Sequence, residues 1–250
     1  MNVISPPPFH PLLPPPTSGG EIRQKIITAL PPGEGKAAYP EGVEMIELTT
    51  PVSGEQILKL HAGDRVLISG VAVTGRDTAH KYMIEKLIEG APALSAGDRK
   101  LYDELSSILR GGAIYHCGPI VRREGEKWSF VSAGPTTSIR DEIYQDKVIK
   151  AFGVRFVIGK GGMGPRTLAA CKEHGAVYLH GIGGAGVYNA ASVVEVLDVF
   201  KAEEFGLPEA FWKIRLDRFP GIVTMDAHGS SLHDDLAKIF DRRLEELVTH

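Results

Sequence analysis

The sequence predicts an α/β fold in which helices flank a largely parallel central sheet. Its central part alternates short apolar runs with helical segments, joined by short connections rich in glycine. This order of elements is typical of a parallel sheet with right-handed crossovers. Residues 66–73 form a near-continuous apolar run, which indicates a strand buried on both faces. With 250 residues, 43% of them hydrophobic, the chain is long enough to bury a proper core.

Two parts of the chain differ in composition. Residues 1–40 are dominated by proline, which predicts an extended arm lying on the body or on a partner, and a disordered tail fits the composition equally well. Residues 41–250 are predicted to form a single domain. Near its start, Ser53 and Gln56 have the spacing of a capping box, which predicts a short helix to Leu60.

The remaining elements follow from apolar periodicity and from glycines at helix ends. Asp77 or Thr78 is expected to cap the helix after the 66–73 strand, and Gly90 to end it. Later helices are predicted at residues 91–110, 140–152, 166–174 and 187–202, and strands at 113–121, 127–131, 154–158, 176–180, 212–217 and 222–225. The last helix, from Leu232, carries its apolar side chains on one face.

Composition and charge exclude several classes of function. The net charge of -3, without a long basic run, argues against nucleic acid as a partner. No apolar stretch approaches the roughly 20 residues of a membrane span, and no secretion signal is visible, so we expect a cytoplasmic protein without membrane contact. The two cysteines, Cys117 and Cys171, cannot build a disulfide framework, a paired-ligand zinc site or an iron–sulfur cluster of their own.

Two glycine-rich loops fit the pattern G-x-G-x-x-G, at residues 159–164 and 181–186, each between a predicted strand and a predicted helix. This placement favours a dinucleotide site, but the strand after the first loop ends in Leu179-His180, without the acidic residue that binds a ribose hydroxyl. A loop of this kind suits any small anion, carboxylates included. Glycines that serve only tight turns and close packing are the alternative interpretation.

Three cations and two hydroxyls occupy comparable positions. Arg76, Arg140 and Lys160 each follow a predicted strand, so we expect them at one edge of the sheet, where they favour an anion site. Structural ion pairs are the alternative for each cation taken alone. Thr136 and Thr137 precede Arg140 and either cap the next helix or act in chemistry with help from a nearby cation. His80 lies on the apolar stripe of its helix and is expected to be a buried, hydrogen-bonded histidine; the alternative is that it orients the loop of Arg76, one turn away.

Several motifs occur in one order along residues 43–230, and together they resemble a known family. They are Leu48-Thr49-Thr50-Pro51, Gly63-Asp64, Thr74-Gly75-Arg76-Asp77-Thr78-Ala79-His80-Lys81, His116-Cys117-Gly118-Pro119-Ile120-Val121, Gly134-Pro135-Thr136-Thr137 with Arg140, Gly159-Lys160-Gly161-Gly162-Met163, and Phe219-Pro220-Gly221-Ile222-Val223-Thr224-Met225-Asp226. The family is the β subunit of two-subunit iron–sulfur hydro-lyases, which is also the C-terminal domain of single-chain class I fumarases. Tartrate dehydratases and mesaconases share it.

The resemblance implies a swivelling β/β/α domain that closes over a [4Fe–4S] cluster held by three cysteines of a separate α subunit. The cluster's open iron then acts as a Lewis acid while water is added to, or removed from, a dicarboxylate. The family's functional positions carry over to Thr136 as the base and to Arg76, Arg140 and Lys160 as substrate contacts. Thr137 and Gly161 are expected to line the same site, and Asp77 and His80 to support it.

Fumarate or malate is the expected substrate, and a tartrate dehydratase or mesaconase subunit is the first alternative. The second alternatives are an NAD(P)-dependent oxidoreductase built on the glycine loops and a carboxylate-binding module without catalysis. The expected assembly is a hetero-oligomer with the α subunit, or a homodimer when the chain is alone. The sequence departs from the family at Asp141, where many relatives have methionine, and at Gly181, where alanine is common.

Overall fold

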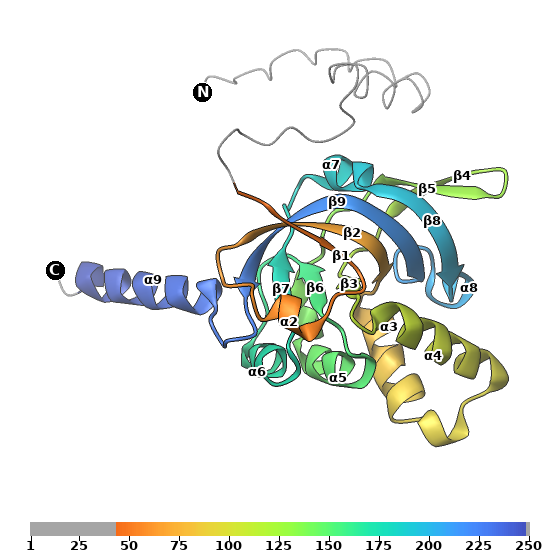
Figure 1. Cartoon of the computed structure of the whole chain (residues 1–250), viewed down its shortest axis with the longest axis horizontal. Coiled ribbons are helices and arrows are strands. Elements are labelled where there is room, and N and C mark those ends of the chain that lie inside the picture. Colours follow the sequence, from red (N-terminus) through yellow and green to blue (C-terminus); the bar gives the residue numbers. More distant parts are fainter. Residues whose placement is uncertain (1–43, 249–250) are drawn as a thin grey trace, which may run out of the picture. The chain divides into compact units, whose positions relative to one another are not determined.

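The computed structural model of the chain describes residues 44–248, and its centre is a seven-stranded sheet (Figure 1). The strand order is β1-β2-β3-β6-β7-β9-β8. These strands are β1 (Ile46–Thr49), β2 (Arg65–Thr74), β3 (Ala113–Tyr115), β6 (Phe156–Gly159), β7 (Val177–His180), β8 (Val193–Phe200) and β9 (Phe211–Met225). The neighbours from β1 to β7 are parallel, whereas β9 is antiparallel to its partners. The predicted proline-rich arm, residues 1–40, lies outside the described residues.

The sheet closes on itself. Strand β9 is 15 residues long and pairs with β2 as well as with β7 and β8, so β2, β3, β6, β7 and β9 form a closed barrel of five strands. The α/β class, with a central sheet and flanking helices, is confirmed. The parallel sheet that the strand–helix repeat predicts closes into a barrel, because β9 pairs with β2 on one side and with β7 on the other. The two strands predicted at 212–217 and 222–225 are parts of β9.

Alternating residues of the parallel strands divide the apolar core in two. Tyr115, Ile158 and Leu179 belong to a cluster that takes residues from all five barrel strands and fills the barrel. Ile114 and Tyr178, one position away, belong to a second cluster that is completed by residues of the flanking helices. Strands β6 and β7 are therefore covered on both faces.

The helices lie on both sides of the barrel. On one side lie α3, α4, α5 and α6, and on the other lie α7 and the hairpin of β4 and β5 (Figure 1). The helical segments are α2 (Gly54–Ile57), α3 (Asp77–Tyr82), η1 (Met83–Ile88), η2 (Ala91–Ala93), α4 (Ala96–Leu109), η3 (Ser138–Asp141), α5 (Glu142–Phe152), α6 (Pro165–His174), α7 (Gly186–Ala191), α8 (Ala202–Phe205) and α9 (Leu232–Val248). The predicted capping box before α2 is confirmed: Ser53 and Gln56 each bond the other's backbone N–H.

The strand predicted at residues 113–121 is two strands. Strand β3 ends at Tyr115, and β4 (Ile120–Glu124) pairs instead with β5 (Lys127–Ser132) as a separate hairpin. Between them, Pro119 has no N–H to donate to a ladder. A Cβ at Gly118 would lie 2.5 Å from the Arg76 guanidinium and 2.8 Å from the Pro208 carbonyl oxygen. The break therefore lets the chain pass close to a residue of the candidate site.

The helix predicted at residues 187–202 is wrong over most of its length. Helix α7 ends at Ala191, and residues 193–200 form strand β8, which pairs with β9. Four of these eight residues are valine. β-branched side chains lose little freedom in a strand, and an antiparallel partner far along the chain supplies the ladder.

The C-terminal helix α9 extends away from the barrel (Figure 1). It has the predicted apolar face, but none of its residues is buried, and Phe240 is 67% exposed. None of the helices between residues 44 and 248 has the length and hydropathy that a membrane span needs.

Candidate functional site

Arg76 follows β2 and stands at the first turn of α3, where it forms an ion pair. Its Nη1 lies 3.1 Å from Oε1 of Glu209, the residue two positions before β9. The other oxygen of Glu209 accepts the backbone N–H of Thr78 at 3.1 Å. The prediction that Asp77 or Thr78 caps this helix is therefore wrong: Arg76 is the capping position, and Glu209 supplies the carboxylate.

Thr136 and Arg140 contact each other directly. Arg140 Nη2 donates to Thr136 Oγ1 at 3.0 Å and lies 3.3 Å from Asp77 Oδ1. Asp77 thus joins the loop after β2 to the loop before α5. Thr137 is the capping position of η3 without a side-chain bond, so the alternative interpretation of the two threonines as caps does not hold.

Lys160 lies at the end of β6, and its backbone is bonded to the Thr136 segment. Its N–H donates to the Thr136 carbonyl at 3.3 Å, and its carbonyl accepts the Ser138 N–H at 3.1 Å. The side chain passes over the second glycine loop, because a Cβ at Gly183 would lie 3.5 Å from Lys160 Cδ. Within residues 44–248, no carboxylate forms an ion pair with the Lys160 ammonium.

Two positions of the first loop require glycine on different structural grounds. Gly161 has φ +80°, and a Cβ there would meet no atom within 4 Å, so it faces open space beside Lys160. Gly162 has φ +79°, and a Cβ there would lie 2.4 Å from the His233 ring. The loop therefore needs the left-handed conformation at both positions and close packing at the second.

The N-terminus of α6 already holds an anion, the side chain of Glu142. Its carboxylate accepts the backbone N–H groups of Gly164 and Arg166 at 2.8 Å each, and that of Thr167 at 3.2 Å. The Thr167 hydroxyl donates to it at 2.6 Å. These N–H groups are the ones that a dinucleotide phosphate would use after the first glycine loop. An internal carboxylate takes the place predicted for an external anion.

A buried polar cluster lies between α3, β3 and η3. His80, His116 and Asp141 have no exposed surface, and their ligating atoms lie within 4.8 Å of one another. Burial lowers the pKa of His116 to about 3 and raises the pKa of Asp141. These residue types bind metal ions, but all four ring nitrogens already have hydrogen-bond partners, so we do not assign a metal here.

His80 makes the contact that its position predicts. Its Nδ1 lies 3.0 Å from the carbonyl oxygen of Arg76, and its Nε2 lies 3.0 Å from Gln145 Oε1. Its backbone N–H also donates to the Arg76 carbonyl, at 2.8 Å. The backbone carbonyl of Arg76 is therefore bonded by both the ring and the backbone N–H of a buried histidine.

The two cysteines do not fit the ligation of an iron–sulfur cluster. Cys117 and Cys171 are fully buried, and burial raises the pKa of each thiol to about 12, far from the thiolate form that binds iron. They also belong to different core clusters. A cluster needs about three or four such ligands.

The structure thus brings Arg76, Asp77, Thr136, Arg140 and Lys160 to one end of the barrel, where β2 and β6 end. Sequence patterns did not indicate two carboxylates: Glu142, which accepts N–H groups at the start of α6, and Glu209, which pairs with Arg76. Each meets partners more than 20 residues away along the chain or in another element, so no local pattern indicates them.

Comparisons with known proteins show which sequences this chain resembles. A family model described as fumarase C-terminus matches residues 21–236. The chain is 39% identical over 202 residues to the L(+)-tartrate dehydratase subunit beta of Escherichia coli, covering 80% of this chain and 92% of that protein. It is 46% identical over 195 residues to a protein named "Putative fumarate hydratase class I" from Geobacillus stearothermophilus. That match covers 78% of this chain and 34% of the relative, so the chain spans about a third of that protein's length.

Proposed function

The chain belongs to the fumarase C-terminus family, and from this premise we propose that it is the β subunit of a hydro-lyase acting on a dicarboxylate. Fumarate and malate are the proposed substrates, and a tartrate dehydratase or mesaconase subunit is the first alternative. The relatives support the reaction class, since one is named a fumarate hydratase and another a tartrate dehydratase subunit. The name of the second relative, a subunit beta, supports a separate partner chain.

One observation carries the proposal. Lys160 sits among glycines, without an ion pair to any described carboxylate, and its backbone is bonded to the segment of Thr136. The Arg140 guanidinium donates a hydrogen bond to the oxygen of Thr136. An ammonium without a described counter-ion, on a segment whose backbone is bonded to that of Thr136, favours an anionic ligand.

In the proposed mechanism, this chain binds and orients the substrate. Lys160 and Arg140 bind carboxylate oxygens, and Arg76 exchanges its contact with Glu209 for a substrate carboxylate. The Thr136 hydroxyl exchanges a proton with the substrate carbon. The Arg140 N–H that it accepts stabilises negative charge on its oxygen, which a threonine requires to act as a base.

A [4Fe–4S] cluster is proposed to be held by the partner α subunit. The buried thiols of this chain do not suit it, so no step of the mechanism is assigned to cluster ligands here. We further propose that residues 41–250 act as one domain, that this domain swivels over the partner's site, and that the complex is a cytoplasmic hetero-oligomer.

A nucleotide-dependent oxidoreductase is disfavoured by Glu142. Its carboxylate occupies the amides that would bind a pyrophosphate, and His180 stands where an acidic residue would bind the ribose. A binding module without catalysis would need the same cations but not Thr136. Replacement of Thr136 therefore distinguishes a hydro-lyase subunit, which loses activity, from a binding module, which keeps its carboxylate binding.

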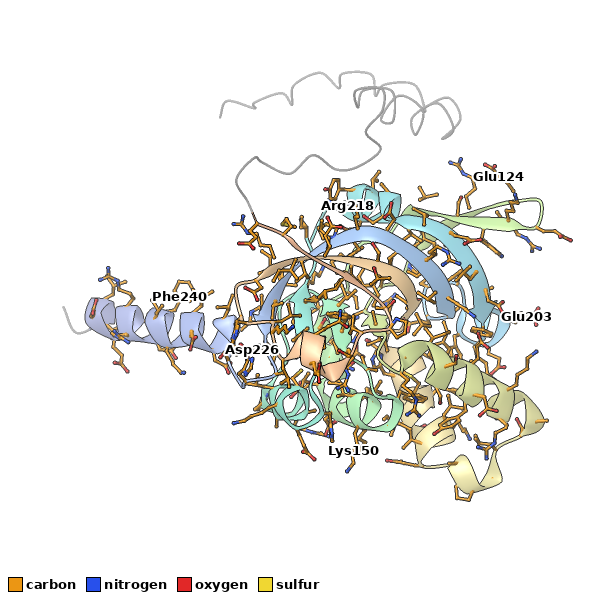
Figure 2. All side chains as sticks on the ribbon, in the orientation of Figure 1. Glu124, Lys150, Glu203, Arg218, Asp226 and Phe240 are labelled. Atoms are coloured by element: carbon orange, nitrogen blue, oxygen red, sulfur yellow. The ribbon has the colours of Figure 1, made fainter. Side chains whose placement is uncertain are left out.

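The proposal is tested with the anaerobically purified complex of this chain and a cluster-bearing large subunit. Replacing Lys160 by alanine is expected to lower kcat/KM for fumarate hydration roughly 10- to 150-fold, the equivalent of about 1.5–3 kcal/mol for a charge-assisted hydrogen bond. Lys150→Ala is the matched control, because Lys150 is exposed on α5 (Figure 2). A cluster-loaded complex that turns over no 2-hydroxydicarboxylate contradicts the proposal.

A further inference from the structure

Beneath the two arginine loops, five polar side chains form a fully buried network. His80, His116, Ser138, Asp141 and Gln145 all have no exposed surface. Groups in such surroundings must satisfy their hydrogen bonds and balance their charges among themselves. The positions of their protons therefore follow from which atoms face each other.

The direction of the hydrogen bonds is set from Tyr178. Its hydroxyl donates to Ser138 Oγ at 2.9 Å. The Ser138 hydroxyl is then free to donate to His116 Nδ1, also at 2.9 Å. His116 consequently carries its single proton on Nε2, which faces Gln145 Oε1 at 2.9 Å.

This direction also fixes the Gln145 amide. With a proton on His116 Nε2, the atom that faces it must be the carbonyl oxygen, because the amide nitrogen would set donor against donor. The same oxygen faces His80 Nε2 at 3.0 Å, so that nitrogen donates as well. The other ring nitrogen of His80 faces the Arg76 carbonyl, which can only accept. Both nitrogens of His80 therefore carry protons.

Asp141 supplies the matching negative charge: burial raises the pKa of its carboxyl, and a charged His80 beside it acts in the opposite direction. Its Oδ1 lies 3.8 Å from His80 Nδ1, and no donor in the described part of the chain bonds either oxygen. The charges that act on Asp141 from neighbouring elements include Asp77, Arg140 and Glu209. Asp77, Asp141 and Glu209 are three carboxylates, and Arg76 and Arg140 are two guanidinium groups. A protonated His80 adds the third positive charge, so that the positive and negative charges are equal in number.

We propose that His80 is a buried imidazolium paired with Asp141, and that this pair positions both arginines of the site. His80 holds the Arg76 carbonyl through its backbone and its ring, and Asp141 directly follows Arg140. The pair thus links α3, which carries His80, to η3, which carries Asp141. The ion pair of Arg140 with Asp77 joins the same two elements. The effect on catalysis rests on the proposed function, whereas the charge state does not.

The charge state is measured on the isolated chain by nitrogen NMR of labelled histidine rings. At neutral pH, His80 is expected to show two protonated nitrogens and His116 one, with the signals assigned from His80→Gln and His116→Gln. In Asp141→Asn and in Asp141→Met, His80 is expected to lose one of its protons. His174→Gln is the control on a histidine outside the network. A wild-type His80 with a single proton, or a metal ion found on both Nδ1 atoms, overturns the proposal.

The positioning role is measured in the complex with the large subunit. Asp141→Asn is expected to raise KM for the dicarboxylate about tenfold with a smaller change in kcat, because the arginines bind substrate but do not transfer its proton. An unchanged KM together with the expected loss of the His80 proton overturns the positioning role. A complex without any dicarboxylate turnover overturns the proposed function instead and leaves the NMR result standing.

Discussion

Thr136 is the residue that we propose as the base. Its oxygen accepts a hydrogen bond from the Arg140 guanidinium at 3.0 Å, which supports this proposed role. Thr136→Ser is expected to keep most of the activity of the complex, because it retains the oxygen. Thr136→Val is expected to lower kcat by roughly 10²–10⁴, the usual contribution of a general acid–base group. Equal losses in both variants would point to packing of the methyl group instead.

Asp226 illustrates a buried acid with a structural role. It lies just after β9 (Figure 2) and accepts the backbone N–H groups of Ala62, His228 and Ser230 at 2.9 Å each. Burial alone would raise its pKa, but these backbone donors outweigh burial, and the pKa lies below the ordinary 3.8. The folded state therefore binds the Asp226 proton less tightly than the unfolded state does. The stabilisation is present above pH 3.8 and is lost as the pH falls through the folded-state pKa.

Replacement of Asp226 by alanine should reveal this dependence. The variant is expected to lose about 1.5–3 kcal/mol of unfolding free energy at neutral pH, as measured by urea denaturation, and less below the ordinary pKa. The exposed Glu203→Ala (Figure 2) is expected to change stability by less than about 0.5 kcal/mol. A loss of the same size at every pH would contradict the link between the lowered pKa of Asp226 and the stability of the fold.

The candidate site could be predicted from the sequence in its cations but not in their partners. Arg76, Arg140 and Lys160 follow strands, and strand ends of one sheet meet at one edge, so local pattern was enough to group them. Asp77, the counter-ion of Arg140, was expected to support the site, but Glu209, the counter-ion of Arg76, belongs to a contact set by the tertiary fold. No rule of spacing relates an acid before β9 to an arginine after β2.

At the scale of elements, local signals predicted the parallel core correctly. Gly153 and Gly175 end α5 and α6 in the left-handed conformation, as glycine at those positions indicates. Strand β8 was missed because its stability comes from pairing with β9 rather than from its own pattern. The closed barrel was missed for the same reason, since the pairing of β9 with β2 joins residues about 150 positions apart.

Helix α6 provides the prediction at this scale. Glu142 caps it from another helix, with four hydrogen bonds to Gly164, Arg166 and Thr167. Glu142→Ala leaves these donors unpaired and removes a negative charge from the positive end of the helix, so we expect a loss of about 1–3 kcal/mol in urea unfolding.

Asp146→Ala is the matched control for Glu142→Ala. Asp146 also contacts Arg166, at 2.7 Å, but through an ion pair in which the Arg166 side chain is 47% exposed. Such surface pairs contribute about 0–1 kcal/mol, so the control is expected to lose less. Similar losses in both variants would mean that the cap contributes no more than a surface ion pair.

For the molecule as a whole, the barrel positions the site and α9 stands apart from it. The family model ends at residue 236, near the start of α9, and the rest of the helix carries exposed apolar side chains. Ile239, Phe240, Leu244 and Leu247 are 51–77% exposed and lie on one face. Apolar patches of this kind on an isolated chain favour association, and a single amphipathic helix gains most of its stability from packing.

Truncation after Leu236 tests the role of this helix. Because no residue of α9 is buried, the truncated chain is expected to unfold at the same urea midpoint as the full chain. The full chain alone is expected to self-associate with rising concentration in sedimentation equilibrium, and the truncated chain to stay monomeric. Phe240→Glu (Figure 2) should reproduce the monomer without shortening the chain, because it places a charge in the middle of the apolar face. Self-association that persists in both variants would place the contact elsewhere, and a lowered midpoint in the truncated chain would show that α9 supports the barrel despite its exposure.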